Sequence, residues 1–370
     1  MSEKVRVAIA GLGFGAEFIP IYQAHPDAEL VAVCQRSKDD LDRVADSFEV
    51  PRRYTAFDEM LRDPDIDAVH INTPIAAHAE HTIAALEAGK HVACTVPMAT
   101  TLDECRAIVA AVRESGKRYM MMETVVYSRE FLHVQDLVAD GTIGRLQFMR
   151  GSHHQEMAGW PGYWEGLPPM YYATHAVSPV LALANTLAES VVCLGSGRIA
   201  PNLEAHYGSP FAVESALLTL RDTEVGAEIA RSLFETAREY VESFTVFGDR
   251  ATFEWEQTQG SGHVLHVGEA PARIDVPDFA HRLPKEIARF TTRGVYDEEN
   301  EHLSFVQGAG HGGSHPHLVH EFVRSIAEDR APAVDEATAA NWTSVGICAH
   351  ESAMRGGARV AVPDYAEVRR

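Results

Sequence analysis

Short apolar runs alternate with amphipathic stretches along the first third of the chain. The runs have the length of buried strands, and the stretches between them have the period of helices. Strands and helices that alternate at this spacing predict a parallel, doubly wound α/β sheet. We expect strands at residues 5–10, 28–34, 68–73, 91–94 and 119–122, and helices at residues 17–24, 82–89 and 102–115, the last of which Thr101 would cap.

The first predicted strand runs into the turn Gly11-Leu-Gly13-Phe14-Gly15-Ala16, which a helix follows. In a strand–turn–helix context this pattern is typical of dinucleotide binding. Gly11 permits the tight turn, and Gly13 lets backbone N–H groups approach a pyrophosphate at the helix N-terminus. The alternative, a glycine-rich loop without a ligand, fits the following segments less well.

The second predicted strand ends at Gln35-Arg36-Ser37-Lys38, where an acidic side chain usually holds the adenosine ribose of NAD. Gln35 can bond a ribose hydroxyl. Arg36, Ser37 and Lys38 can instead receive the 2′-phosphate of NADP, or be solvated loop residues. The sequence favours NAD and leaves NADP open.

The carboxyl ends of parallel strands meet at one edge of a sheet, where ligands bind. At this edge we expect Gly11, Gln35, Thr73, Thr95 and Glu123. The cofactor-binding residues predicted from the whole domain are Gly11, Gly13, Phe14, Gly15, Gln35, Arg36, Thr73, Pro74, His78, Thr95, Val96 and Glu123.

In the second half, residues 146–155 alternate as a strand, which places His153 and Gln155 on one face. Both could bond sugar hydroxyls, or they could be polar residues at a strand end. The loop from Trp160 to Trp164 is aromatic, so it could stack on a sugar ring, cover the cofactor or be part of the core. We expect His153, Gln155, Trp160 and Tyr127 to bind substrate.

His175 lies three residues after Tyr172, one helical turn away, so both side chains can point into one pocket. A lone histidine on an apolar helix would more often be a core residue. The surrounding motif favours a catalytic role for both residues.

Four histidines lie between His311 and His320, a density that suggests a zinc or manganese site. The spacing matches no closed zinc site, and neither cysteine nor an acidic cluster accompanies it. Gly312-Gly313 before Ser314 and Pro316 predicts a loop that enters a helix at residues 317–328, with Ser314 as the N-cap. We therefore expect no metal, and we expect His311 to act on substrate or in proton transfer.

Composition narrows the class of protein. A chain of 370 residues exceeds one typical core and suggests two domains. The 32 basic and 53 acidic residues give a net charge of −21, which argues against nucleic acid or an anionic membrane as partner. Five scattered cysteines suit reduced thiols in a cytoplasmic protein, and no apolar run has the length of a signal peptide or membrane span.

Three segments together resemble the glucose–fructose oxidoreductase/inositol dehydrogenase (Gfo/Idh/MocA) family. The resemblance implies a Rossmann domain at residues 1–124 and, at 125–370, a substrate-binding α/β domain with an open, mostly antiparallel sheet. The last helix would pack back on the first domain, and the second sheet would form a homodimer or homotetramer. The segments are Gly11–Ala16, Asn72–His78 and Gly89–Cys94.

Later motifs are similar to the NAD-dependent glycosidase branch of this family, typified by α-N-acetylgalactosaminidases. Thr95-Val96-Pro97 stands where sugar dehydrogenases of the family carry Glu-Lys-Pro, and this branch also lacks the lysine. The other similar elements are Met122-Glu123-Thr124 ending in Tyr127, Tyr172-Ala-Thr-His175 and Gly310-His311-Gly312-Gly313. Thr95, Thr124 and His153 depart from the branch, so the sugar is expected to differ.

The resemblance implies that His175 assists hydride transfer, although Tyr171 stands where the wider family has an aspartate partner. We expect a redox glycosidase that oxidises C3 of a sugar, eliminates the C1 group, adds water and returns the hydride. His175, Tyr172, His311 and Glu123 are the expected catalytic residues. A sugar or polyol dehydrogenase is the alternative, and a cofactor-binding sensor without catalysis is the second.

Overall fold

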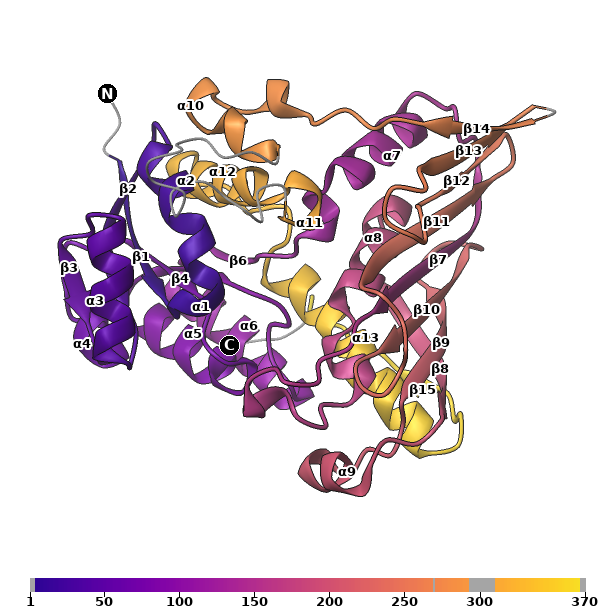
Figure 1. The fold of residues 1–370 in the computed structure, drawn as a ribbon, viewed down its shortest axis with the longest axis horizontal. Coiled ribbons are helices and arrows are strands. Elements are labelled where there is room, and N and C mark those ends of the chain that lie inside the picture. Colours follow the sequence, from indigo (N-terminus) through magenta and orange to yellow (C-terminus); the bar gives the residue numbers. More distant parts are fainter. Residues whose placement is uncertain (1–3, 269, 293–309, 367–370) are drawn as a thin grey trace.

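The computed structural model describes residues 4–268, 270–292 and 310–366, and it contains two β-sheets (Figure 1). All strands of the first sheet are parallel, in the order β3-β2-β1-β4-β5-β6. This is the strand order of a complete dinucleotide-binding Rossmann sheet, in which two halves meet between β1 and β4. The strands are β1 (Val5–Ala10), β2 (Ala28–Cys34), β3 (Arg52–Tyr54), β4 (Ala68–Ile71), β5 (His91–Cys94) and β6 (Tyr119–Met121).

Successive residues of β1 pack into different layers, as the alternation of a strand requires. Val7 and Ile9 face a cluster built from α2 (Ile19–Ala24), α3 (Lys38–Ser47) and α12 (His315–Ala327). Ala8 and Ala10 face the cluster that contains α4 (Phe57–Leu61), α5 (His78–Glu87) and α6 (Leu102–Ser115). Helices therefore cover both faces, and the predicted doubly wound sheet is confirmed.

Several helix boundaries differ from the prediction. Residues 17–24 do not form one helix: α1 (Leu12–Gly15) and a 3₁₀ turn (Ala16–Phe18) precede α2, which begins with Pro20 in its first turn. Thr101 does cap α6, in a reciprocal capping box with Glu104. Ser314 precedes α12, but its side chain makes no capping hydrogen bond, and the helix begins at His315.

The second sheet has nine strands in the order β14-β13-β12-β11-β7-β10-β9-β8-β15. Its neighbours pair antiparallel except β7 and β10, so the expected open, mostly antiparallel sheet is confirmed. The strands are β7 (Leu146–His154), β8 (Ala188–Ser196), β9 (Val213–Leu220), β10 (Gly226–Ser232), β11 (Val241–Gly248), β12 (Ala251–Glu254), β13 (His263–Val267), β14 (Ala270–Ile274) and β15 (Val360–Ala361).

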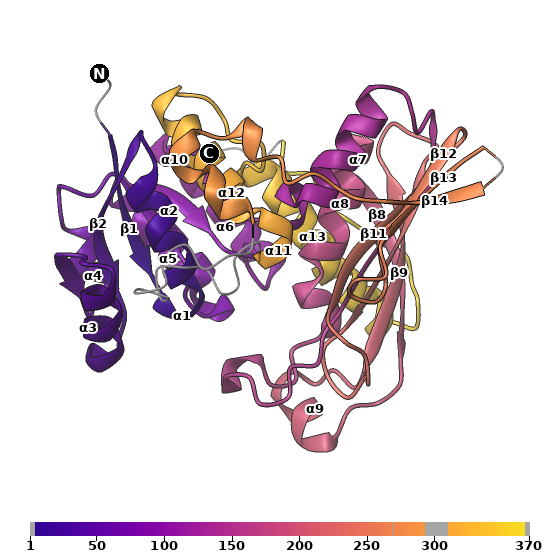
Figure 2. The ribbon, with the colours of Figure 1, turned by 45° about the horizontal axis from the view of Figure 1, so that its top comes forward.

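Helices α7 (Arg129–Ala139), α8 (Thr174–Ala184) and α13 (Glu336–Met354) lie between the two sheets (Figure 2). Helix α8 packs directly on β7. A Cβ atom at Gly151 of β7 would lie only 1.9 Å from the carbonyl oxygen of Ala176 in α8, which shows how closely the two backbones approach. The short helices are α9 (Pro201–Tyr207), α10 (Lys285–Ala288) and α11 (Gly310–Gly313), the last of which packs against α7 and α12.

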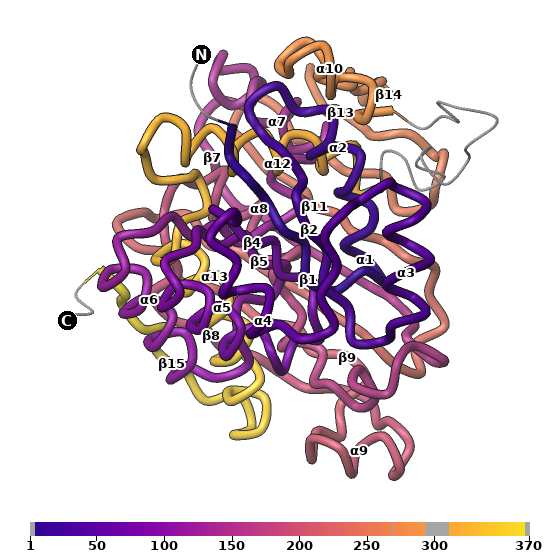
Figure 3. The backbone as a smooth tube through the Cα atoms, turned by 90° about the vertical axis from the view of Figure 1, so that its left-hand side faces the viewer, coloured from indigo at the N-terminus to yellow at the C-terminus, as the bar shows by residue number. Residues whose placement is uncertain are grey.

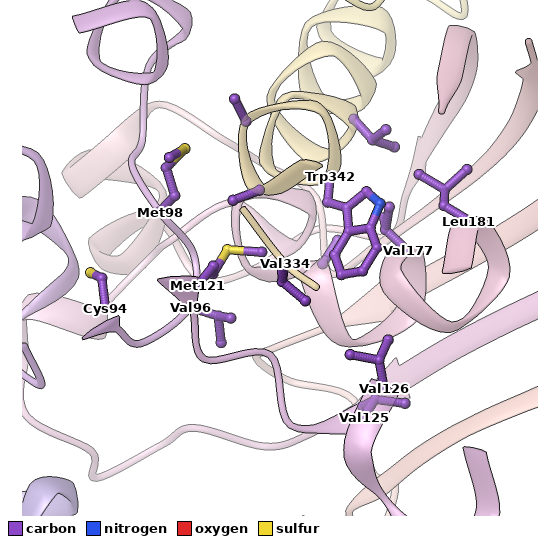
Figure 4. Packing of buried hydrophobic residues seen from close by; sticks show 14 of the residues in the cluster. Cys94, Val96, Met98, Met121, Val125, Val126, Val177, Leu181, Val334 and Trp342 are labelled. Atoms are coloured by element: carbon purple, nitrogen blue, oxygen red, sulfur yellow. The ribbon is translucent and has the colours of Figure 1, made fainter. Parts of the chain in front are cut away.

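One hydrophobic cluster joins the two halves. It runs from the helices of the first sheet through α13 to the inner face of the second sheet. Figure 4 shows Met121 beside Val334, and Trp342 of α13 beside Val177 of α8. In Figure 3 the first sheet and its helices lie in front of α13, β8 and β9. The boundary at residue 124 stays a prediction.

All five cysteines are buried and free in the structure. Among the described residues, the structure has no helix with both the length and the apolarity to cross a bilayer.

Candidate active site

The carboxyl ends of the parallel strands form the edge where the sequence predicts a dinucleotide. Gly11 turns back against β4: its φ is 87°, its N–H donates to the carbonyl oxygen of Cys34, and a Cβ there would lie 2.4 Å from the Asn72 oxygen. At Gly13 a Cβ would meet no heavy atom within 4 Å. The turn therefore presents open backbone, as close approach of a pyrophosphate requires.

Gln35 lies against this turn, where its Oε1 accepts a hydrogen bond from the Leu12 N–H at 3.2 Å. Arg36, Ser37 and Lys38 are exposed. Ser37 caps α3 through the Asp40 N–H, and Lys38 pairs with Asp42 at 2.5 Å. The residues present thus fit the adenosine end of a dinucleotide. Of Arg36, Ser37 and Lys38, the last two already interact with residues of α3.

The next loops are braced by His78. Its two ring nitrogens lie 2.7 and 2.8 Å from the carbonyl oxygens of Pro97 and Thr73. The Thr95 hydroxyl donates to the Ile71 oxygen at 3.1 Å, and Val96 is buried. His78 and Thr95 hold the loops that carry Pro74 and Val96, so their own polar atoms are occupied in the structure.

His175 is the centre of the predicted catalytic group. Its Nδ1 lies 2.7 Å from Oε1 of Glu123, and its Nε2 lies 3.2 Å from the hydroxyl of Tyr172. The 3₁₀ turn η5 (Pro169–Tyr172) and the start of α8 bring Tyr172 and His175 together, and Glu123 follows β6. His175 and Glu123 are buried.

Glu242 was missed by the sequence analysis, although it connects two predicted residues. Its Oε1 lies 3.5 Å from Nδ1 of His175, and its Oε2 lies 3.1 Å from Nδ1 of His311. It pairs directly with His153 across β7 and β11. A glutamate in a buried strand is uncommon unless its carboxylate is paired. The presence of Glu242 in such a strand is therefore the signal by which the sequence could have identified this residue.

The charges of the site support one another. Burial alone would raise the pKa of Glu242, but His311 and His175 together with hydrogen bonds from His311 and Tyr240 lower it to about 2. Burial alone would lower the pKa of His311, but Glu242 more than offsets this and raises it. Glu242 is therefore ionised, and His311 favours its protonated form.

Arg231 holds the backbone around the site and was also missed. This buried guanidinium donates to the carbonyl oxygens of Tyr172, His153 and Ser232 at 2.7 to 2.9 Å and to Oε1 of Gln155 at 3.2 Å. Burial lowers the pKa of Arg231 to about 10, so it keeps its charge at neutral pH. Gln155 thus supports Arg231 with the atom that was expected to bind substrate.

His153 lies beside this group with free bonding capacity. It is buried, and neither ring nitrogen has a hydrogen-bond partner among the described residues. Its ring centroid is 5.1 Å from that of His175. Burial, and after it the charge of Arg231, hold the pKa of His153 well below its usual range, so the imidazole is neutral.

The aromatic loop begins at the site and leads outward. The ring centroids of Trp164 and Tyr172 are 5.0 Å apart in an edge-to-face arrangement. Those of Trp160 and Trp164 are 6.0 Å apart, and Trp160 is 45% exposed. Tyr127 does not join the group. It packs between the two hydrophobic clusters, where its charged neighbours are Glu321 and Arg330.

The nucleotide turn meets the catalytic group through Phe14. The centroid of its ring lies 6.1 Å from that of His311 and 5.5 Å from that of His315. Nδ1 of His315 in turn lies 3.4 Å from Oε2 of Glu17. Burial raises the pKa of Glu17 to about 7, although His311 opposes this shift. The reactive end of a dinucleotide on this turn would therefore lie near His311.

The histidines that suggested a metal have different partners in the structure, although the ring centroids of His311 and His315 are 5.7 Å apart. His311 faces Glu242, His315 faces Glu17, and His320 bonds His25 at 3.0 Å. A different set, His153, His175 and Glu242, presents ligand atoms within 4.8 Å of one another. Both nitrogens of His175 are engaged by Glu123 and Tyr172, so a cation there would have to displace one of them.

Comparison with known proteins matches residues 5–123 to the family model described as "Oxidoreductase family, NAD-binding Rossmann fold". A glycosyl hydrolase family 109 protein of Saccharopolyspora erythraea is 27% identical over 98% of this chain and 83% of its own length. An alpha-N-acetylgalactosaminidase of Shewanella oneidensis is 32% identical over 50% of this chain and 45% of its own length.

Among solved structures, levoglucosan dehydrogenase in complex with NADH has the same fold. The TM-score is 0.79 at 20% identity, with 98% of this chain and 100% of the other covered. The expected resemblance and two-domain fold are therefore confirmed, and the chain is an enzyme of the oxidoreductase type.

Proposed function

We propose that the chain is a redox glycosidase, starting from the match of residues 5–123 to the Gfo/Idh/MocA oxidoreductase family model. Two histidine–carboxylate pairs in one site, His175 with Glu123 and His311 with Glu242, carry the proposal. Oxidation of a hydroxyl needs one base, whereas elimination and water addition need further proton transfers. The relatives named glycosyl hydrolase family 109 support the same reaction.

The first proton transfer belongs to His175 and Tyr172. A bound nicotinamide supplies a reversible hydride acceptor for C3 of the sugar. Tyr172 touches Nε2 of His175, so the C3 hydroxyl proton would pass through the phenol to this nitrogen. Glu123 accepts the Nδ1–H, which keeps Nε2 free to receive a proton and then stabilises the imidazolium. His175 thereby replaces the family lysine, whose position is Val96.

The second proton is the one on C2, which a ketone at C3 makes acidic. We assign its removal to His153, a neutral imidazole with both nitrogens unbonded to described residues. Trp160 and Trp164 lead outward from Tyr172 and offer aromatic faces to the sugar or its leaving group. The substrate class is a small glycoside.

NAD is the proposed cofactor. Gln35 is placed to bond a ribose hydroxyl, while Asp39 and Asp40 in the first turn of α3 would repel a 2′-phosphate. The turn residues Gly11, Gly13 and Phe14 would hold the pyrophosphate, and Thr73, Pro74 and Val96 would contact the nicotinamide half. We also keep the cytoplasm as the proposed location, because five buried thiols remain free.

The test uses the purified protein and a panel of nitrophenyl glycosides. Phenolate and reduced nicotinamide are followed together, and the released sugar is analysed by NMR in heavy water. A redox glycosidase releases phenolate without accumulating reduced nicotinamide and incorporates deuterium at C2. The variant His175→Asn should lose about 10²–10⁴-fold in rate.

The matched control is His266→Asn, which changes an exposed histidine on β13 and should retain full activity. Accumulation of reduced nicotinamide without phenolate would instead identify a sugar dehydrogenase, and cofactor binding without either product would identify a sensor.

A further inference from the structure

Glu242, which the sequence analysis missed, is the middle member of a continuous path of contacts from Tyr172 to His311. The path runs from Tyr172 to Nε2 of His175 at 3.2 Å, from Nδ1 of His175 to Oε1 of Glu242 at 3.5 Å, and from Oε2 of Glu242 to Nδ1 of His311 at 3.1 Å. Each member offers an atom that can both accept and release a proton.

Exposure rises along this path. The side chain of His175 is 2% exposed, that of Glu242 is 6% and that of His311 is 23%. Helix α11 presents His311 at the outer end, in a left-handed conformation with φ 48°. Arg129 fixes this segment through the carbonyl oxygens of Gly312 and Thr291. His311 is therefore held where water reaches it.

Glu123, the other carboxylate at Nδ1 of His175, ends in the interior. Its Oε1 also accepts the Val125 N–H, and its Oε2 is buried with no hydrogen-bond partner among the described residues. A proton given to Glu123 can return only to His175. Of the two carboxylates, Glu242 is the one that leads onward.

We infer that Glu242 and His311 form the path by which the proton taken up by His175 exchanges with solvent, an inference that rests on the proposed function only in taking His175 as the base. After His175 accepts a proton at Nε2, its Nδ1 proton leaves Glu123 and moves to Oε1 of Glu242, an oxygen 3.5 Å away that has no hydrogen-bond partner among the described residues. The protonated carboxyl group turns so that this same proton faces His311 and passes to the unprotonated Nδ1 of the neutral imidazole. The proton on Nε2 of His311 then leaves to water. The return of the proton reverses these steps.

The pH behaviour of the path depends on all groups that face Glu242. The charge of Glu242 raises the pKa of His311, so removing this carboxylate should lower it. The groups are His311 from α11, His175 from α8, Tyr172 from the preceding turn, Glu123 after β6, Arg231 from β10, His153 from β7 and Tyr240 before β11, with Glu17 acting through His311.

The first experiment needs no turnover. Histidine ring signals of the NAD-loaded protein are titrated by NMR, with His311 and His175 assigned through His311→Asn and His175→Asn. Glu242→Gln should lower the midpoint of the His311 titration, because the carboxylate that raises the pKa of His311 is removed. Glu254→Gln, which alters the exposed pair with His266, should leave the His311 signal unchanged. A His311 titration that does not respond to Glu242→Gln would overturn the inference.

The second experiment uses a nitrophenyl glycoside that the wild-type protein cleaves. Glu242→Gln should lower kcat about 100-fold and remove one limb of its pH profile, whereas Glu242→Asp should recover part of the rate. Added imidazole should restore turnover to His311→Ala, because His311 is partly exposed. Absence of rescue together with an unchanged pH profile would refute the path.

The two proposals fail separately. If no glycoside is cleaved but Glu242→Gln lowers the midpoint of the His311 titration, the glycosidase assignment is wrong and the coupling stands. If glycosides are cleaved but Glu242→Gln leaves the His311 titration and the pH profile unchanged, the path is wrong and the assignment stands.

Discussion

At the scale of single residues, Arg231 is a buried charge that needs hydrogen-bond acceptors around its whole guanidinium group. Its charge is buried, and its four hydrogen bonds go to neutral oxygens of Tyr172, His153, Ser232 and Gln155. Lysine has three donors on one atom and cannot reproduce this planar arrangement. The guanidinium therefore fixes three segments of the site at once.

Arg231→Lys should destabilise the fold by about 3 kcal/mol, because at least two buried acceptors lose their donor at about 1–3 kcal/mol each. The measurement is the urea midpoint together with the slope of the transition. Arg198→Lys, at an exposed position paired with Glu204, should change stability by less than about 0.5 kcal/mol. An equal effect of the two substitutions would show that Arg231 contributes no special support.

Glu17 makes stability depend on pH with a definite sign. Its folded-state pKa of about 7 lies above the ordinary glutamate value of 4.5, so the folded protein binds the proton more tightly than the unfolded chain. The stabilisation is complete below pH 4.5 and is lost as the pH rises through 7.

Glu17→Gln keeps the neutral form at every pH. The variant should match the stability of the wild-type protein near pH 4.5 and exceed it by about 3 kcal/mol at pH 8, since each pKa unit between 4.5 and 7 corresponds to about 1.4 kcal/mol. Urea unfolding at the two pH values measures the difference. A variant that is less stable than wild type at pH 8 would contradict the assignment, and Glu254→Gln should show no such trend.

At the scale of elements, two glycines of one turn have separable roles. Gly11 has a positive φ and contacts the Asn72 backbone, so a side chain there strains the turn itself. Gly13 is exposed, and a Cβ would enter open space. The second position matters only when a pyrophosphate lies against it.

Gly13→Ala should therefore leave the melting temperature of the free protein unchanged but reduce the rise produced by NAD. Gly11→Ala should lower the melting temperature of the free protein itself. Thermal unfolding with and without NAD measures both effects. If Gly13→Ala retains the full NAD-induced shift, the dinucleotide does not lie over this turn.

Local patterns predicted most elements but not the pairing between distant ones. The alternation of residues 146–155 predicted β7 and its buried His153, and Thr101 predicted the start of α6, because both signals lie within one segment. Glu242 reaches the site only through the register of β11 on β7, which no local pattern encodes. Tyr127 lies apart from the group for the same reason, because it packs against both hydrophobic clusters, one of which includes residues of α12.

At the scale of the whole molecule, the outer face of the second sheet exposes large apolar side chains. Leu194 of β8 and Leu217 of β9 are 63% and 58% exposed. Apolar side chains gathered on a sheet face are typical of interaction surfaces. We expect this face to form the predicted homodimer or homotetramer.

Leu217→Lys should then convert the oligomer to a smaller species in light scattering after size exclusion, without destabilising the subunit, because the side chain is exposed. Val267→Lys on β13, at the far side of the sheet, serves as the control and should leave the mass unchanged. A wild-type protein that is monomeric would refute the interface.

The shared core predicts that the two halves unfold together. One hydrophobic cluster contains Ala8 and Ala10 of β1 as well as Phe244 and Phe253 of the second sheet, with Trp342 of α13 between them. Separating the halves would expose this cluster, at about 25 cal/mol for each Å² of apolar surface. Neither half therefore has a complete core of its own, despite carrying its own sheet.

The sequence supplies an independent probe for each half. All four tryptophans lie after residue 124, while Cys34, Cys94 and Cys105 lie before it and are buried. Tryptophan fluorescence and alkylation of these thiols should therefore give the same urea midpoint. NAD at 100 times its Kd should stabilise both probes by the same amount, about 2.7 kcal/mol, although it binds at one sheet only. Thiols that react at a lower urea concentration than the fluorescence change would show that the first half unfolds alone. NAD would then raise the urea midpoint of thiol alkylation without changing that of tryptophan fluorescence.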